Sequence, residues 1–386
     1  MTRIYLDWNA TAPMRAEALA HMLERLAATG NPSSVHAEGR AARSLVETAR
    51  QEVATLVNAP ETAVIFTSGG TEAIATALNP RWREKGETKG LSQALIGATE
   101  HAAVLAGGRC DPKLRAYLPV DRDGRLDLQA LDAALAAASG PALVAVQLAN
   151  NETGVLQPIP EIARRVHERE GILICDAVQA AGKVPIDITA LGADALVLSS
   201  HKIGGPQGVG ALVLRDEAIA PSDPLIRGGG QERGHRAGTE AVAAIAAFGM
   251  AASLARIELH ETAAHLARLR DRIESDLLAR LPEAVFFGQA VERLPNTSLI
   301  GLGGASAATL LMALDLSGFA VSSGSACSSG KVKRSHVLDA MGIERRLAES
   351  AIRVSLGRTT TENETIRFVE AFETAAKCLY KKATAA

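Results

Sequence analysis

The 386-residue sequence is poor in aromatic residues, and this shortage limits how its interior can be built. Phe, Trp and Tyr together make up 3% of the chain, whereas hydrophobic residues as a whole make up 47%. The core must therefore form largely from small aliphatic side chains, with helices packed closely on a sheet. The length is too great for one minimal domain and predicts a large domain with a smaller one beside it.

The chain also lacks an excess of charge and a long apolar run. It carries 41 Lys and Arg against 43 Asp and Glu, which argues against nucleic acid or an anionic membrane as its main partner. The first residues hold no basic stretch followed by an apolar one, so no signal peptide is predicted. The longest uncharged helical run, residues 241–255, is too short to span a bilayer and predicts a buried helix. We therefore expect a cytoplasmic globular protein.

Cysteine is scarce, and the spacing of the cysteines argues against two kinds of structure that depend on them. The four cysteines form no CxxC pair and no Cys/His cluster, so neither a disulfide framework nor a zinc site is predicted. Cys175 lies among aliphatic residues and is interpreted as a core residue, whereas Cys110 and Cys378 have no informative neighbours. Cys327 lies among serines and glycines, which favours an exposed thiol acting as a nucleophile or sulfur carrier. An incidental loop cysteine is the alternative.

Short apolar runs alternate with helical patterns from about residue 60 to residue 215. Near-continuous apolar strands separated by helices are typical of an α/β fold with a mostly parallel sheet covered on both faces. Amphipathic helices are predicted at 126–138 and 159–170. The predicted strands are 63–67, 94–98, 142–148, 172–175, 194–199 and 209–214.

A smaller α+β unit is predicted after a Gly-rich stretch at 227–238. A long helical region follows at about 239–281. Beyond it we expect a strand near 297–302, a helix from Ala305, a strand near 320–322, and a final helix near Thr361, where TTTENE is typical of a helix cap. The predicted division assigns 14–255 to the large domain and 1–13 with 256–386 to the small one.

Lys202 follows a predicted strand that ends in Ser-Ser-His-Lys and precedes a loop of glycine and proline. The hydroxyl of Ser199 and the ring of His201 suit a phosphate, and the glycines let a bulky ligand approach the backbone. A lysine beside a bound aldehyde can lose its proton and form a Schiff base. A solvated surface lysine is the alternative.

Asp176 stands at the end of an apolar strand, where a carboxylate is costly unless it meets a cation or a hydrogen-bond donor. A pyridinium N–H would supply both, and the ion pair would keep the ring protonated as an electron sink. Gln179, three residues later, is placed to reach the same ligand. A helix-capping aspartate is the alternative.

Three further positions suggest a ligand site. The segment FTSGGTE contains Gly70 and Thr71 between a predicted strand and a predicted helix, a geometry that binds phosphate. An ordinary strand–helix turn is the alternative. The segment matches neither the Walker pattern nor the dinucleotide fingerprint. His101 also follows a predicted strand and is a candidate for this site. A structural histidine is the alternative. Arg353 lies inside an apolar run, where its guanidinium suits a carboxylate of the substrate or a structural salt bridge.

Taken in order, these segments resemble the cysteine desulfurases of the NifS/IscS type, within the class V aminotransferase group of fold-type-I pyridoxal-phosphate enzymes. The resemblance extends from YLDWNATAP near the start to SLGRTTTE near the end. The motifs that carry it are GNPSSVHAEG, FTSGGTE, TEHAAV, NNETGVLQPI, CDAVQAAGK, SSHKIGGPQGVG, GGGQERGHRAGTE and SSGSACSSG. It implies a large domain with a mostly parallel seven-stranded sheet, a smaller α+β domain, and a homodimer.

The resemblance also implies a role for each residue around pyridoxal 5′-phosphate. Lys202 would hold the cofactor covalently, Asp176 would pair with the ring nitrogen, Gln179 would contact the ring hydroxyl, and His101 would stack on the ring and move protons. The phosphate would be bound by Gly70, Thr71, Ser199 and His201, with Thr239 contributed by a partner subunit.

The implied reaction removes sulfur from L-cysteine. Asn151, which also contacts the cofactor, and Arg353 would hold the substrate carboxylate. Cys327 would take the sulfur as a persulfide and pass it to an acceptor, such as a scaffold protein for iron–sulfur clusters. The alternatives are a selenocysteine lyase or aminotransferase of the same family, and a sulfur-relay protein without turnover.

The sequence departs from the family pattern at a few positions. Trp8 stands where the family commonly has asparagine, and residues 73–75 are Ala-Ile-Ala in place of Ser-Asn-Asn. Gly205 and Gln207 differ from the family in the loop after Lys202. None of these is assigned to bond making; they concern the detail of the substrate pocket and the choice of sulfur acceptor.

Overall fold

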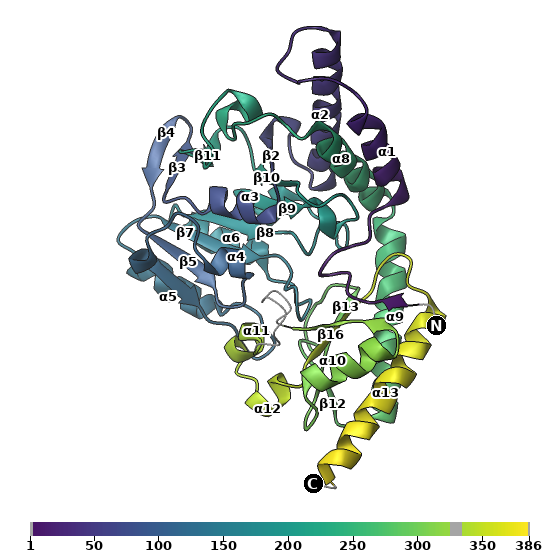
Figure 1. Cartoon of the computed structure of the whole chain (residues 1–386). Helices are drawn as coiled ribbons and strands as arrows, with labels where there is room; N and C mark the ends of the chain where they lie inside the picture. Colours follow the sequence, from purple (N-terminus) through teal and green to yellow (C-terminus); the bar gives the residue numbers. More distant parts are fainter. Residues whose placement is uncertain (1–2, 325–333, 385–386) are drawn as a thin grey trace.

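The computed structural model describes residues 3–324 and 334–384. Within these residues the largest sheet has seven strands, in the order β2-β10-β9-β8-β7-β5-β6 (Figure 1). Neighbouring strands run parallel except for the two pairs made by β10, which is antiparallel to β2 and to β9. The strands are β2 (Val64–Thr67), β5 (Gln93–Gly97), β6 (Arg115–Leu118), β7 (Ala142–Gln147), β8 (Ile172–Asp176), β9 (Ala195–Ser199) and β10 (Gly210–Leu214). The predicted mostly parallel seven-stranded sheet is confirmed.

Six of these strands coincide with the predicted apolar runs to within two residues. The seventh, β6, was not predicted as a strand. It lies at the edge of the sheet beside β5, and only Leu118 of its four residues is buried. An edge strand with Arg115 and Tyr117 on its surface has no continuous apolar run, so its sequence carries little of the pattern on which the prediction relied.

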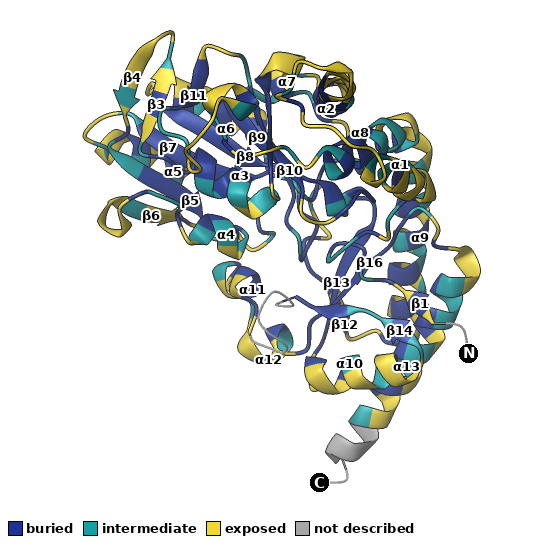
Figure 2. Cartoon of the chain, turned by 45° about the horizontal axis from the view of Figure 1, so that its top comes forward, coloured by how far each residue is buried: buried dark blue, intermediate teal, exposed yellow. Residues whose placement is uncertain are grey.

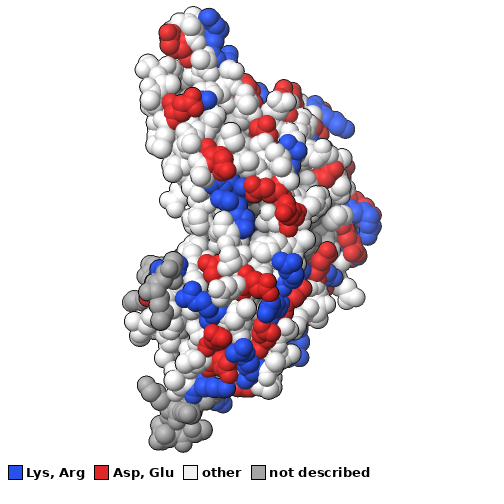
Figure 3. Space-filling model, turned by 90° about the vertical axis from the view of Figure 1, so that its right-hand side faces the viewer, with Lys and Arg blue, Asp and Glu red and all other residues white. Residues whose placement is uncertain are grey.

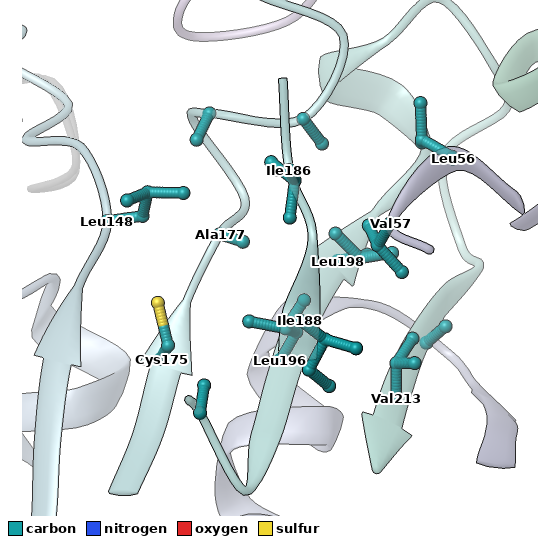
Figure 4. Close-up of a cluster of buried hydrophobic side chains, with 14 of the residues drawn as sticks. Leu56, Val57, Leu148, Cys175, Ala177, Ile186, Ile188, Leu196, Leu198 and Val213 are labelled. Atoms are coloured by element: carbon teal, nitrogen blue, oxygen red, sulfur yellow. The ribbon is translucent and has the colours of Figure 1, made fainter. Parts of the chain in front are cut away.

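Helices cover both faces of the large sheet. Successive residues of a strand point to opposite faces, and in β9 Leu196 and Leu198 belong to one buried cluster whereas Ala195 and Val197 belong to another. The first cluster lies under α2 (Ala37–Leu56) and α8 (Val242–Ile257), and Figure 4 shows part of it, including Cys175. Cys175 is fully buried, as its aliphatic context predicted.

The remaining elements of this part of the chain surround the sheet. Figure 2 shows buried strands in the interior and exposed faces on the outer helices. A separate three-stranded sheet has the order β11-β3-β4. These elements are α1 (Ala16–Leu26), α3 (Gly70–Ala77), β3 (Arg81–Glu84), β4 (Glu87–Gly90), α4 (Ala102–Leu105), α5 (Leu128–Ala137), α6 (Ile159–His167), α7 (Ile188–Leu191) and β11 (Ile219–Pro221).

The long helical region expected at 239–281 consists of two helices, α8 and α9 (Leu259–Arg280), which meet at Glu258 with a bend of 69°. The Glu258 carboxylate accepts a hydrogen bond of 2.7 Å from the buried Arg15 guanidinium at this corner. The two helices pack into different cores. Within the described residues, no single helix is long and apolar enough to cross a membrane. The bent pair of α8 and α9 reaches that length and apolar composition only when its two helices are taken together.

A second core lies around a four-stranded sheet of order β12-β13-β16-β15. The N-terminal strand β1 joins this part of the molecule by pairing in parallel with β14. The division at residue 255 stays a prediction. The elements here are β1 (Ile4–Tyr5), β12 (Ala284–Phe286), β13 (Thr297–Leu302), α10 (Ala307–Leu316), β14 (Phe319–Ala320), β15 (Ser322–Ser323), α11 (His336–Ala340), α12 (Arg345–Ala348), β16 (Ile352–Ser355) and α13 (Glu362–Thr384).

The predicted cap of the last helix is confirmed. The Glu364 carboxylate accepts a hydrogen bond of 2.7 Å from the Thr361 backbone N–H, and the Thr361 hydroxyl accepts one of 3.3 Å from the Glu364 N–H. This reciprocal pair is a capping box. On the face shown in Figure 3, acidic and basic side chains are interspersed, as expected for a nearly neutral chain.

Trp8, one of the departures from the family pattern, packs directly on Gly357. A Cβ on Gly357 would overlap the indole ring, and Trp8 is 8% exposed. We predict that Gly357→Ala lowers the free energy of unfolding by about 1–3 kcal/mol through overpacking. Gly90→Ala is the control, because a Cβ there meets open space and should change stability by less than about 0.5 kcal/mol. Thermal melts that coincide for the wild type and Gly357→Ala would show that Trp8 is not tightly packed.

Candidate active site

A cavity of about 280 Å³ lies at the carboxyl ends of β7, β8 and β9. In α/β sheets this edge is the usual place for a ligand. The structure brings nine of the predicted site residues to its wall: Gly70, Thr71, His101, Asn151, Asp176, Gln179, Ser199, His201 and Lys202.

Lys202 reaches the cavity from a short 3₁₀ turn, Ser200–Lys202, that directly follows β9. Its Nζ donates hydrogen bonds to the backbone carbonyls of Asn9 at 2.5 Å and Ala10 at 2.9 Å. The N-terminal segment therefore holds the amine at the cavity wall through neutral acceptors. Sequence reasoning missed this contact because carbonyl groups leave no side-chain signal.

Asp176 ends β8 and is 9% exposed. Its Oδ1 accepts a hydrogen bond of 2.9 Å from the Val178 backbone N–H. Burial raises the pKa of the Asp176 carboxyl, while the charges of His101 and Lys202 oppose that rise. A protonated ring nitrogen in the cavity would compensate the buried charge of the carboxylate.

The N-terminus of α3 supplies an anion site on the same wall. Gly69, its N-cap residue, has φ of 154°, a conformation that favours glycine, and no side chain of the described part of the chain caps the helix there. The first backbone N–H groups, at Gly70 and Thr71, are thus available to an anion. A Cβ on Gly70 would lie 3.5 Å from Cβ of Ser199, which places the Ser199 side chain at the same end of the cavity.

His201 lies beside Lys202 as a neutral ring. Burial, together with the nearby charges of Lys202 and Lys183, lowers the pKa of His201 to about 4. Its Nδ1 lies 3.0 Å from the Thr11 hydroxyl. At neutral pH the ring can therefore bind a ligand as a hydrogen-bond partner without adding charge.

His101 is the N-cap residue of α4, where its Nδ1 accepts a hydrogen bond of 3.2 Å from the Ala103 backbone N–H. In the neutral ring, accepting at Nδ1 places the proton on Nε2. The backbone contact fixes the ring at the cavity wall, so His101 is both a structural cap and a cavity residue.

Asn151 and Arg353 lie in contact, but only Asn151 is on the cavity wall. The Asn151 carbonyl accepts a hydrogen bond of 3.0 Å from Nη1 of Arg353, and Nη2 of Arg353 pairs with Asp7 at 2.6 Å. Nε of Arg353 is buried and has no hydrogen-bond partner among the residues that the structure describes. The salt bridge considered from the sequence is thus present, and the Nε–H is left for another acceptor.

Of the two remaining predicted site residues, the structure describes one. Thr239 is exposed, in the segment before α8, and is not among the cavity residues. Cys327 lies outside the described residues, between Gly324 and Arg334.

Sequence reasoning missed two polar side chains. Gln147 lines the cavity from the end of β7 and donates from Nε2 to the Thr99 carbonyl at 2.9 Å. A polar residue that ends an apolar strand is the signal that identified Asp176, and it could have identified Gln147. Lys183 is buried and donates to Oε1 of Gln179 at 3.0 Å; burial and nearby positive charge lower its pKa to about 7.

The donor set in this cavity fits pyridoxal 5′-phosphate. An amine, a buried carboxylate and a helix N-terminus with adjacent hydroxyl and imidazole groups match an aldehyde, a ring nitrogen and a phosphate. The fold and this cavity define an enzyme of the fold-type-I class, whose members use that cofactor.

The aminotransferase class-V family model matches residues 4–368, and the chain belongs to this family. A cysteine desulfurase of Cereibacter sphaeroides is 44% identical over 96% of this chain and 95% of the relative. A cysteine desulfurase of Trichormus azollae is 41% identical over 96% and 92%. The X-ray structure of a NifS-like protein from Rickettsia africae superposes with a TM-score of 0.86 at 35% identity, covering 97% of this chain and 99% of that one.

Proposed function

We propose that the protein is a pyridoxal-phosphate-dependent cysteine desulfurase, which converts L-cysteine to L-alanine and leaves the sulfur on Cys327 as a persulfide. The observation that carries the proposal is one cavity that holds Lys202, Asp176 and the open N-terminus of α3. Relatives named cysteine desulfurase, similar over nearly the whole chain, support the choice of substrate.

When bound, the cofactor supplies an electron sink for the charge that develops at Cα of the amino acid. Lys202 would hold the aldehyde, and its amine would then carry the proton removed from Cα. Asp176 would keep the ring nitrogen protonated, and Gln179 would contact the ring hydroxyl. His101 would stack on the ring and could move protons. The first N–H groups of α3, together with Ser199 and His201, would bind the phosphate.

Asn151 and Arg353 bind the carboxylate of L-cysteine. Asn151 lies on the cavity wall, and the Arg353 guanidinium beside it is fixed by Asp7 and the Asn151 carbonyl. The Nε–H of Arg353, which has no other acceptor among the described residues, would be offered to the substrate. A guanidinium that is already oriented binds a carboxylate with little loss of side-chain entropy.

Sulfur transfer is assigned to the thiolate of Cys327. It attacks the sulfur of the bound cysteine, an S–S bond forms, and the C–S bond breaks with its electron pair remaining on the carbon side. Protonation of that carbon releases L-alanine, and the persulfide stays on Cys327. An acceptor, such as a scaffold protein for iron–sulfur clusters, then removes the outer sulfur.

A homodimer is part of the proposal. The exposed Thr239 and the Gly-rich segment before it would reach the phosphate of a second copy of the chain, as the family pattern implies. Light scattering of the loaded enzyme at micromolar concentration should give twice the chain mass.

Product analysis tests the proposed function. The purified protein, loaded with pyridoxal 5′-phosphate and given L-cysteine and a reductant, should form alanine and sulfide in equal amounts. An aminotransferase would instead require a 2-oxo acid and would form a new amino acid from it. A lyase specific for selenocysteine would release alanine from that substrate and none from L-cysteine.

We predict that Asp176→Asn lowers kcat/KM for L-cysteine by at least about a hundredfold, because a neutral amide cannot stabilise the protonated ring nitrogen as charge develops. The cofactor should still bind through Lys202. Asp194→Asn is the control, since Asp194 is also a buried carboxylate, directly before β9, and pairs with Arg215 at 2.7 Å, outside the cavity lining. Equal activity of Asp176→Asn and the wild type would remove Asp176 from the cofactor site.

A further inference from the structure

Glu152 is a buried carboxyl that the proposed reaction leaves without a role. It follows Asn151 in the turn after β7, and it is 2% exposed. The turn is fixed by the Asn150 side chain, whose Oδ1 accepts hydrogen bonds of 2.9 Å from the backbone N–H groups of Glu152 and Thr153. Asn151 thus lines the cavity while its neighbour Glu152 is held in the protein interior.

The Glu152 carboxyl contacts both flanks of the segment that contains Cys327. Its Oε2 accepts a hydrogen bond of 2.6 Å from the Ser335 hydroxyl. The same oxygen lies against Gly324, where a Cβ would overlap it. Gly324 and Ser335 stand on either side of residues 325–333. The Glu152 side chain therefore binds one flank of this segment through a hydrogen bond and lies against the other flank.

The contact to Ser335 extends into α11. The Ser335 hydroxyl also accepts a hydrogen bond of 3.1 Å from the Leu338 backbone N–H and so caps that helix. The next residue, His336, lies with Nε2 2.9 Å from the Glu100 carbonyl. The second flank is thus fixed to the loops at the cavity edge by two adjacent side chains.

The charges around Glu152 affect its protonation and therefore the strength of its hydrogen bond with Ser335. Burial raises the pKa of Glu152 to about 7, while the Ser335 hydroxyl and the charge of Arg353 act in the opposite direction. Arg353 is itself paired with Asp7, and Arg334, beside Ser335, is paired with Asp339. A hydroxyl donates more strongly to a carboxylate than to a neutral carboxyl. The hydrogen bond from Ser335 to Glu152 should therefore strengthen as pH rises through about 7, because Glu152 then loses its proton.

We propose that Glu152 is a positioning residue for sulfur transfer: by binding Ser335 and lying against Gly324, it sets the two flanks of the Cys327 segment so that the thiol meets the sulfur of the bound substrate. This inference rests on the proposed function. It assigns Glu152 to the transfer step and to no part of cofactor binding, because the carboxyl contacts the flanks and does not line the cavity.

Rapid mixing of the loaded enzyme with L-cysteine tests the proposal, with two signals followed in one experiment. Glu152→Ala should leave the change in cofactor absorbance as fast as in the wild type, and should slow persulfide formation on Cys327 by roughly ten- to hundredfold. Glu274→Ala is the matched control, since Glu274 is also buried and accepts from a serine hydroxyl, at 2.7 Å from Ser298. It should form the persulfide at the wild-type rate.

Two further variants keep the test decisive if Glu152→Ala folds poorly. Gly324→Ala displaces the carboxyl from the other flank and should also slow the transfer step. Glu152→Gln retains an acceptor for Ser335 and should recover most of the rate, while losing the rise with pH near 7 that the wild type shows. Normal persulfide formation in Glu152→Ala, or in Gly324→Ala where that is the folded variant, would overturn the proposal. A wild type that forms no persulfide would instead refute the proposed function.

Discussion

Lys202→Ala should form alanine from L-cysteine at least about a thousandfold more slowly than the wild type. The amine at this position is expected both to hold the aldehyde and to carry the Cα proton, and loss of a proton carrier alone costs 10²- to 10⁴-fold, on the order seen for general acid–base groups. Alanine formation at saturating cofactor and substrate is the measurement. The structure supports the effect because Nζ is fixed at the cavity wall by the carbonyls of Asn9 and Ala10.

The control for this variant is Lys113→Ala. Lys113 is exposed and is not among the cavity residues, so its replacement should leave the rate unchanged. A small primary amine added to Lys202→Ala should restore part of the activity, because it can carry the proton that the side chain no longer carries. Turnover within tenfold of the wild type would rule out Lys202 as the group that holds the cofactor.

Cys327→Ser should reduce alanine formation to about 1% of the wild-type rate or less, and no persulfide should form. The serine hydroxyl has a far higher pKa than a thiol and is a poor nucleophile toward sulfur, so the C–S bond of the substrate loses its acceptor. The cofactor should still bind, and its absorbance should still change when L-cysteine is added. Mass spectrometry of the intact chain after mixing with L-cysteine measures the persulfide directly.

Cys378→Ser is the matched control for this experiment. Cys378 is an exposed free thiol on the last helix, and its replacement should alter neither product. If Cys327→Ser keeps full turnover, sulfur leaves the substrate without capture by this thiol. The protein would then be a lyase or aminotransferase of the same family.

The fold could be predicted from the sequence where a strand is buried on both faces. β7, β8 and β9 have six, five and five buried residues in succession, and each gives an apolar run that only a covered sheet accommodates. The edge strand β6 gives no such run. The break between α8 and α9 was not visible either, because Glu258 is an ordinary helix former and its role depends on Arg15, distant in sequence.

The cavity was predictable for a similar reason. Polar residues at the ends of apolar strands must meet a partner, and parallel strands bring their carboxyl ends to one edge, which is how Asp176 and Lys202 come together. Contacts made by backbone carbonyls or between distant loops produce no such pattern in the sequence. The carboxyl of Glu152, the amine of Lys183 and the pairing of Arg353 with Asp7 depend on tertiary packing, so only the structure shows them.

The most direct test of the central claim is to locate the cofactor on the chain. The loaded protein is treated with borohydride, which reduces a Schiff base to a stable amine, and is then digested and sequenced by mass spectrometry. A pyridoxyl group on Lys202 is the expected result. A pyridoxyl group on Lys183, a buried lysine that contacts Gln179 of the cavity wall, or on no lysine at all, would contradict this assignment.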